Sequence, residues 1–313
     1  MNTTRRAGLA LALVTAGVSA FSVYVNASAV RAFESATVYT TAKNLVAALL
    51  LGLVAVAAAG ARRSSGAERY RPRGARQWLG LVTIGVVGGS LPFVLFFEGL
   101  AKASSPQAAF IHKTLVVWVA LLALVVLRER LGWPHLAAVL ALLLGQVGLS
   151  RAGLFPLDTG ALMILGATLL WSVEVVLAKR LLADVPSWAL AVARMGLGSV
   201  LLLAWVGVQG QLGALVSLSV VQLQWLAVTG ILLTGYVSFW FAALARAQAV
   251  DVTAILVIGA VGTAVIAGVV DGVSLAPQAP WLITILLGAA LVAWSMVRRP
   301  TVPAVEPQPV DAR

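Results

Sequence analysis

The sequence predicts an all-α polytopic membrane protein whose ten transmembrane helices form two inverted repeats of five helices. Composition is the first observation that predicts this class. Hydrophobic residues make up 61% of the 313-residue chain, charged residues make up 11%, and the mean hydropathy is +0.99, whereas soluble domains carry about 25% charged residues. The other two observations are a series of long apolar segments and a set of short motifs that occur in both halves of the chain.

Ten apolar segments approach the length of about 20 residues that a helix needs to cross a bilayer. They span residues 7–28, 38–60, 78–99, 106–127, 132–150, 159–178, 187–208, 222–245, 250–270 and 279–297. In the third segment, Gly88, Gly89 and Pro92 predict a break in the helix, because proline removes a backbone hydrogen bond. The longest connection, Ala61 to Gln77, is too rich in arginine to cross a membrane.

The basic residues predict the orientation, since cytoplasmic connections carry the excess of lysine and arginine. With the amino terminus inside, most of the 22 basic residues lie in inner connections, and only Arg31, Lys102 and Arg151 lie in outer ones. We therefore expect both termini in the cytoplasm, with residues 301–313 as a disordered tail. The preference for arginine over lysine is typical of GC-rich bacteria, which places the protein in a bacterial inner (plasma) membrane.

The amino-terminal segment has a second interpretation. Arg5 and Arg6, followed by an apolar run and Ala27-Ser28-Ala29, are similar to a cleavable signal peptide. Cleavage would leave nine helices and would upset the charge distribution. The internal repeat also argues against it.

Charged residues inside the apolar segments are the candidate functional residues. His112 and Lys113 lie in the fourth segment, where a lysine at the bilayer centre costs about 3 kcal/mol. Such a residue normally faces a protein interior or a watery cavity and marks a transport pathway. Lys113 is also close enough to Pro106 for its long stem to reach the membrane surface, so a purely structural role stays open.

Four further charges form two expected pairs. Lys43 and Glu98 both lie toward the outer ends of their segments, whereas Glu174 and Arg194 both lie in the inner half of the membrane. A pair toward each face is what the gates of an alternating-access carrier require. Ion pairs that only orient helices are the alternative, because buried pairs are weak evidence of stability.

The internal repeat follows from two motif matches. Residues 21–25 (FSVYV) are similar to residues 171–175 (WSVEV), and residues 99–103 (GLAKA) are similar to residues 243–247 (ALARA). Because five helices are an odd number, the second copy enters the membrane in the opposite orientation. Transporters with inverted repeats bind their substrates near the midplane, between the repeats.

Three motifs resemble the drug/metabolite transporter superfamily, EamA-type. They are Lys113-Thr114-Leu115, Leu127-Arg128-Glu129-Arg130-Leu131 and Gly145-Gln146-Val147-Gly148-Leu149. The second half departs from the family pattern, with Val270-Asp271-Gly272 in place of a Gly-Glu turn. The resemblance implies one five-helix EamA-like repeat in residues 1–150 and a second in residues 151–300, and it implies export of amino acids, other metabolites or drugs.

Several other functions are excluded or disfavoured by the sequence. There is no cysteine, no H-E-x-x-H, no G-x-S-x-G and no nucleotide-binding G-x-x-x-x-G-K-[ST] motif. We therefore expect no enzyme activity, no metal and no cofactor. Nucleic acid is not an expected partner, since the arginines lie in short loops. The expected partners are a small-molecule substrate and membrane lipid, for a monomer or homodimer. His135, which follows Pro134 at a helix end, is expected to be solvated.

The leading hypothesis is a secondary transporter that exports a small metabolite, such as an amino acid or other carboxylate. Lys113 and His112 would bind the carboxylate or couple transport to protons. Three aromatic residues, Tyr24, Trp171 and Trp240, would contact the apolar remainder. The alternative is a cationic or lipophilic drug exporter of the same fold.

Overall fold

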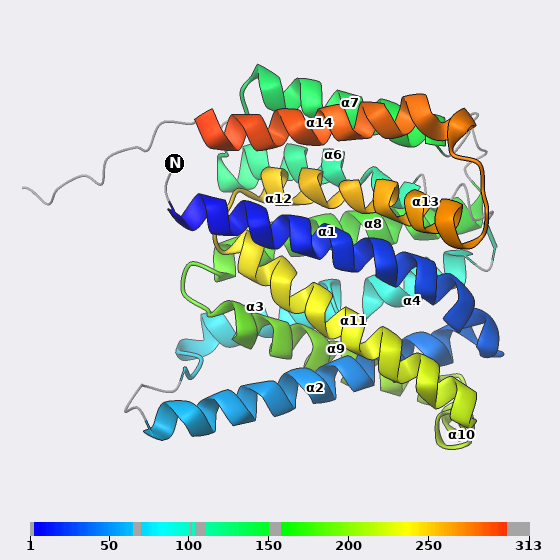
Figure 1. Ribbon diagram of the computed structural model, residues 1–313. Coiled ribbons are helices and arrows are strands. Elements are labelled where there is room, and N and C mark those ends of the chain that lie inside the picture. The colour runs from blue at the N-terminus through cyan, green and yellow to red at the C-terminus, as the bar shows by residue number, and fades with distance from the viewer. Residues whose placement is uncertain are drawn as a thin grey trace, which may run out of the picture.

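The computed structural model describes residues 3–64, 70–100, 102–103, 111–129, 131–149 and 158–298, and within these ranges it contains helices and no strand (Figure 1). The α-helices are α1 Thr3–Ala29, α2 Ala36–Ser64, α3 Gly74–Val87, α4 Leu91–Leu100, α6 Leu115–Leu122, α7 Trp133–Leu149, α8 Thr159–Leu181, α9 Ser187–Val208, α10 Leu212–Val216, α11 Val220–Leu244, α12 Ala249–Leu256, α13 Ile258–Val270 and α14 Ala279–Arg298. The short helices are η1 Val30–Ala32, η2 Ala123–Leu127 and η3 Ala276–Gln278.

Eight helical stretches in the described part of the chain are long and apolar enough to cross a membrane. Two further apolar helices, Ile111–Leu127 and Trp133–Leu149, are shorter. These ten stretches fall on the ten predicted segments, and Ser187–Val208 coincides with its prediction at both ends. The beginning of the fourth predicted segment, residues 106–110, lies outside the described residues. Hydropathy predicts helix positions well because it is a local property of the sequence.

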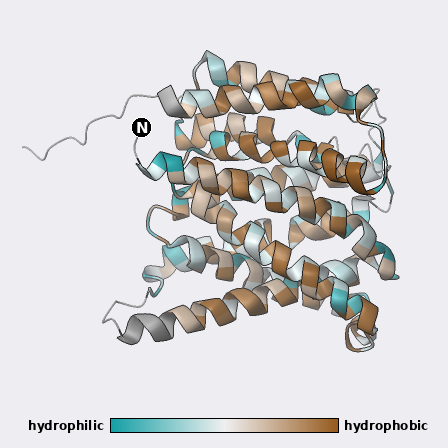
Figure 2. Ribbon diagram, in the orientation of Figure 1, coloured by the Kyte–Doolittle hydropathy of each residue, from teal (hydrophilic) through white to brown (hydrophobic). Residues whose placement is uncertain are grey.

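The outer surface of the helices is apolar, as contact with lipid requires. Figure 2 shows hydrophobic residues along the length of the helices. Leu53 is 57% exposed and Val56 is 72% exposed. Patches of this kind are rare on soluble monomers.

The predicted break in the third segment is confirmed. Helix α3 ends at Val87 and α4 begins at Leu91. In the turn between them the Ser90 hydroxyl donates to the Gly85 carbonyl at 3.1 Å. Pro92 is the second residue of α4, where its missing N–H leaves no helical hydrogen bond unmade. A second interruption, at Val257 between α12 and α13, was not predicted.

Helix packing repeats between the two halves. Helix α1 packs on α11 and α13, and its counterpart α8 packs on α4 and α6. Helix α2 packs on α11, as α9 packs on α3, while α2 contacts α9 and α7 contacts α14. Exchanging the two halves therefore converts each of these contacts either into another of them or, for α2 with α9 and α7 with α14, into itself. Figure 1 also shows the beginning of α1 and the ends of α2 and α14 on the same side of the molecule.

Candidate functional site

A buried ion pair joins the first two helices of the second half. The Arg194 guanidinium on α9 donates through Nε to Oε1 of Glu174 on α8, and through Nη2 to Oε2 at 3.2 Å. Glu174 is 3% exposed and Arg194 is 7% exposed. The predicted pairing of these two residues is confirmed. Both oxygens of the carboxylate are occupied, which is the strong, two-point form of this interaction.

The broken third segment packs directly on this pair. A Cβ atom added to Gly88 would lie 2.5 Å from the Glu174 Oε1 atom, so the carboxylate occupies the space that a side chain would fill. The Arg194 Cζ atom lies 5.7 Å from the centroid of the Phe93 ring, a favourable cation–π distance. The helix break therefore places a glycine and an aromatic face against the two charges.

An aromatic cluster extends from the pair toward the fourth segment. Trp171, one turn before Glu174, lies with its ring centroid 5.4 Å from that of Phe93, 5.6 Å from that of Phe96 and 5.0 Å from that of His112. Its indole Nε1 donates to the Gly88 carbonyl at 3.3 Å. The structure thus brings the predicted site residues Trp171 and His112 together.

Two neighbouring polar residues of the fourth segment have polar groups with no partner within the described residues. The His112 Nδ1 atom is buried there and makes no hydrogen bond. Lys113 is half-buried and forms neither a hydrogen bond nor an ion pair with any described residue. A buried polar atom without a protein partner calls for a specific explanation, such as a bound molecule.

Lys43 occupies the corresponding place in the first half. Its ammonium group donates to Asn26 Oδ1 at 2.9 Å and lies 4.9 Å from the Tyr39 ring centroid. The Tyr39 hydroxyl donates to the same Asn26 oxygen. Asn26 belongs to α1 and Lys43 to α2, just as Glu174 and Arg194 belong to α8 and α9. Lys43 and Arg194 each lie seven residues after the start of their helix, roughly 10 Å along the axis.

The predicted pairing of Lys43 with Glu98 is wrong. Glu98 instead accepts a hydrogen bond from Gln209 Nε2 at 3.2 Å. The reason is the arrangement of the helices: α4 packs chiefly on α8, and α2 packs on α9 and α11, so the two charges face different neighbours. Sequence reasoning missed Asn26 because only charged residues were considered as partners.

Two predicted aromatic residues lie away from the cluster. The Tyr24 hydroxyl, near the end of α1, donates to Asp271 Oδ1 at 2.7 Å, just after α13. Trp240 is 6% exposed in the core and stacks on Tyr236, with ring centroids 6.2 Å apart. Tyr236 lies within electrostatic range of both Arg194 and Glu174.

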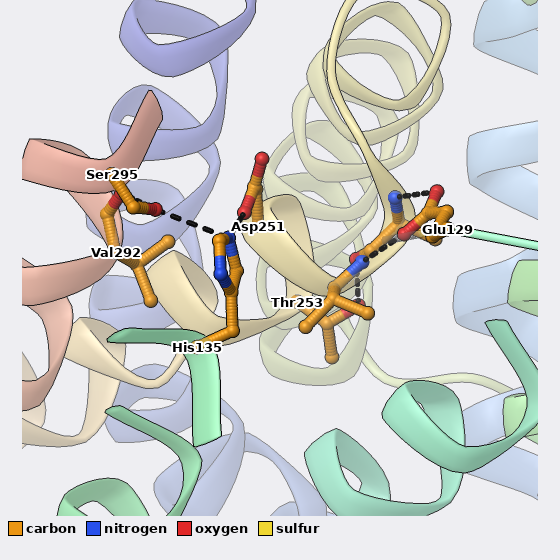
Figure 3. A network of polar contacts seen from close by, with 8 residues as sticks. Glu129, His135, Asp251, Thr253, Val292 and Ser295 are labelled. Carbon is orange, nitrogen blue, oxygen red and sulfur yellow. Dashed lines mark hydrogen bonds and ion pairs between the residues drawn. The ribbon is translucent and has the colours of Figure 1, made fainter. Parts of the chain in front are cut away.

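A second buried polar network joins α7, α12 and α14 (Figure 3). His135 Nε2 lies 3.2 Å from Asp251 Oδ1 and 3.1 Å from the Ser295 hydroxyl. His135 is only 2% exposed, so the expectation of a solvated histidine is wrong. Residues from α12 and α14 cover it, and the sequence around Pro134 contains no sign of that covering.

Glu129 and Lys179 hold the connection between α11 and α12 from two sides. The Glu129 carboxylate accepts the backbone N–H groups of Ala249 at 2.8 Å and Val250 at 3.4 Å, which lie at the start of α12 (Figure 3). The Lys179 ammonium donates to the carbonyls of Leu244 and Ala247, both at 2.6 Å, near the end of α11. Burial raises the pKa of the Glu129 carboxyl, although the two N–H donors and Lys179 oppose that rise.

The family is settled by a match over both halves of the chain. The model of the EamA-like transporter family matches residues 6–151 and again residues 158–295. The chain belongs to the EamA-like transporter family. The resemblance inferred from short motifs is therefore confirmed, and so is the internal repeat. Membership makes this EamA-like protein a membrane transporter of the drug/metabolite type.

A solved structure supports the fold of this EamA-like chain. The match has a TM-score of 0.70 and 20% sequence identity, and it covers 93% of this chain and 98% of the other; its title reads "Crystal structure of protein". No curated protein matches the sequence. The fold is therefore shared with a crystal structure, while the substrate of this EamA-like transporter has to be inferred from its own residues.

Proposed function

We propose that this transporter exports a small carboxylate-bearing metabolite, such as an amino acid, by alternating access. The observation that carries the proposal is that two lysines of the apolar segments have no carboxylate partner among the described residues. Lys43 and Lys113 are cations of the apolar segments, and neither forms an ion pair within the described residues, whereas Arg194 is neutralised by Glu174. A substrate carboxylate supplies the missing negative charge, because a cation inside a membrane protein is favourable only when it is paired or hydrated.

Lys113 is the proposed binding residue. It directly follows His112, whose ring packs against Trp171 and Phe96. A carboxylate on the Lys113 ammonium group would leave the apolar part of the substrate against these rings. Pockets of this kind combine aromatic walls with a few polar groups that fix the orientation of the ligand. The unpartnered Nδ1 atom of His112 is a second polar contact for the substrate.

The two helix-pair clusters are the proposed gates. Arg194 with Glu174 and Lys43 with Asn26 occupy equivalent positions in the two halves. If the halves are inverted, these clusters lie toward opposite faces of the membrane. Alternating access then consists of breaking one cluster while the other holds, as rocking of repeats about a central site requires.

The proposed topology is ten crossings of a bacterial inner membrane, with both termini in the cytoplasm. The beginning of α1 and the ends of α2 and α14 lie on the same side of the molecule in Figure 1, which supports this topology. The arginine-rich connection Ala61 to Gln77 follows from the end of α2, so the positive-inside rule identifies that side as the cytoplasm.

One observation favours the alternative, a cationic or lipophilic drug exporter. Trp171, Phe93 and Phe96 form an aromatic surface of the kind that binds organic cations. Purified protein in proteoliposomes distinguishes the two functions. We expect flux of amino acids or organic acids and little flux of a quaternary ammonium dye. Robust flux of the dye alone would replace our proposal with the alternative.

A further inference from the structure

Two grooves open between the helices, and each is lined by helices from both halves of the chain. The first has a volume of about 570 Å³ and is lined by α1, α2, α9 and α11. The second has a volume of about 620 Å³ and is lined by α3, α4, α8 and α9. We call them the Arg246 groove and the Glu98 groove after the charged residue that lines each of them.

The internal repeat relates these two grooves. Helices α1, α2 and α11 of the Arg246 groove correspond to α8, α9 and α4 of the Glu98 groove. Three pairs of lining residues have the same separations as the repeated sequence motifs. They are Leu51 and Leu201, Ser238 and Val94, and Ala242 and Glu98.

The charges of the two grooves differ. The Arg246 groove carries a guanidinium group together with the hydroxyl groups of Tyr70, Ser187 and Ser238. Glu98 and Gln209 are the most polar residues of the Glu98 groove. Arg246 is exposed; its Nη1 atom donates to the Ala242 carbonyl at 2.7 Å, and it pairs with no carboxylate among the described residues.

The walls of the Arg246 groove are open to lipid. Val54 is 63% exposed and Val56 is 72% exposed on α2, and Phe239 is 36% exposed on α11. At the end that carries Arg246, the rings of Tyr70 and Trp188 meet edge to face at 6.2 Å. Tyrosine and tryptophan concentrate at the level of the lipid headgroups. The groove therefore runs from apolar surface to a headgroup-level cluster of hydrogen-bond donors.

We propose that the Arg246 groove binds an anionic phospholipid of the leaflet on the arginine-rich side. The acyl chain lies along Val54 and Phe239, and the phosphate accepts hydrogen bonds from the Arg246 guanidinium and from the Ser187 hydroxyl. Arginine is suited to this role because its planar group binds phosphate through two N–H donors. Basic pockets between membrane helices are known to hold anionic headgroups. The inference goes beyond transport and does not depend on the substrate.

The test is lipid retention by the purified protein, measured by native mass spectrometry after addition of phosphatidylglycerol or of phosphatidylethanolamine with the same acyl chains. We expect phosphatidylglycerol to be retained preferentially by the wild type. Arg246→Gln should reduce that retention about fivefold, the effect of one basic residue near the headgroups. Lys102→Gln is the matched control, because Lys102 is the exposed cation at the equivalent position of the other half. It should retain the lipid like the wild type.

Two further variants separate the headgroup contact from the fold. Arg246→Lys keeps the charge and should keep most of the preference. Ala55→Trp fills the groove from α2 without changing any charge and should also lose the lipid. Equal retention of phosphatidylglycerol by Arg246→Gln and the wild type would overturn the proposal, as would equal retention of the two lipids by the wild type.

Discussion

Replacing Gly88 by alanine should disconnect Glu174 from Arg194 without removing either charge. The new Cβ atom would lie 2.5 Å from Glu174 Oε1 and 2.7 Å from its Cγ. Ordinary contacts between such atoms are about 3.5 Å or longer, so the side chain has to withdraw by about 1 Å. The backbone itself accepts alanine, since Gly88 has φ −116° and ψ −41°.

The size of the effect follows from this displacement. The hydrogen bond from Arg194 Nη2 to Glu174 Oε2 is 3.2 Å long, and a withdrawal of about 1 Å takes it beyond hydrogen-bonding distance. Overpacking of a close-packed site costs about 1 to 3 kcal/mol. The matched control is Gly196→Ala on α9, two residues after Arg194, where an added Cβ meets nothing within 4 Å. That change should be neutral or should stabilise the helix by roughly 0.5 to 1 kcal/mol.

The assay is the unfolding midpoint of each variant in detergent, combined with a double-mutant cycle. We expect Gly88→Ala to lower the midpoint and Gly196→Ala to leave it unchanged or raise it. In the Gly88→Ala background, Glu174→Gln should cost less than it does in the wild type, because the pair is already broken. Identical midpoints for the two alanine variants, or additive effects of Gly88→Ala and Glu174→Gln, would refute the reasoning.

Three further predictions concern the proposed gate, the topology, and the Glu129 carboxylate that binds the first N–H groups of α12. Glu174→Gln and Arg194→Gln should each impair substrate flux in proteoliposomes. If both variants transported at the wild-type rate, the proposed gate at Glu174 and Arg194 would be contradicted. Reporter fusions within the connection Ala61 to Gln77 and after Arg313 should both report cytoplasm, and a periplasmic signal from either would contradict the ten-helix topology. Because burial raises the pKa of Glu129, its contribution to stability is present below its ordinary pKa of about 4.3 and is lost as the pH rises through the raised value. Glu129→Gln should therefore flatten the fall of the unfolding midpoint as the pH rises above about 4.3; an unchanged pH dependence would contradict this assignment.

The sequence predicts the helices and one of the two expected ion pairs. Glu174 lies seven residues before the end of α8 and Arg194 lies seven residues after the start of α9, so the short connection places both at a similar depth. Pairing of Lys43 with Glu98 depended on which helices become neighbours in space, and hydropathy contains no information about that. Burial of His135 depended in the same way on how α12 and α14 are placed.

We expect the Lys113 ammonium group to bind the carboxylate of the transported molecule. The most direct measurement compares wild type, Lys113→Met and Lys113→Arg for flux of a carboxylate-bearing substrate in proteoliposomes. The liposomes contain equal amounts of each protein, and the variants compared have the same unfolding midpoint as the wild type. The account predicts that Lys113→Met abolishes flux, because the methionine side chain has a similar length and no charge. Lys113→Arg should retain some binding, because the positive charge is kept while its geometry changes. Unchanged carboxylate flux through Lys113→Met would contradict the account.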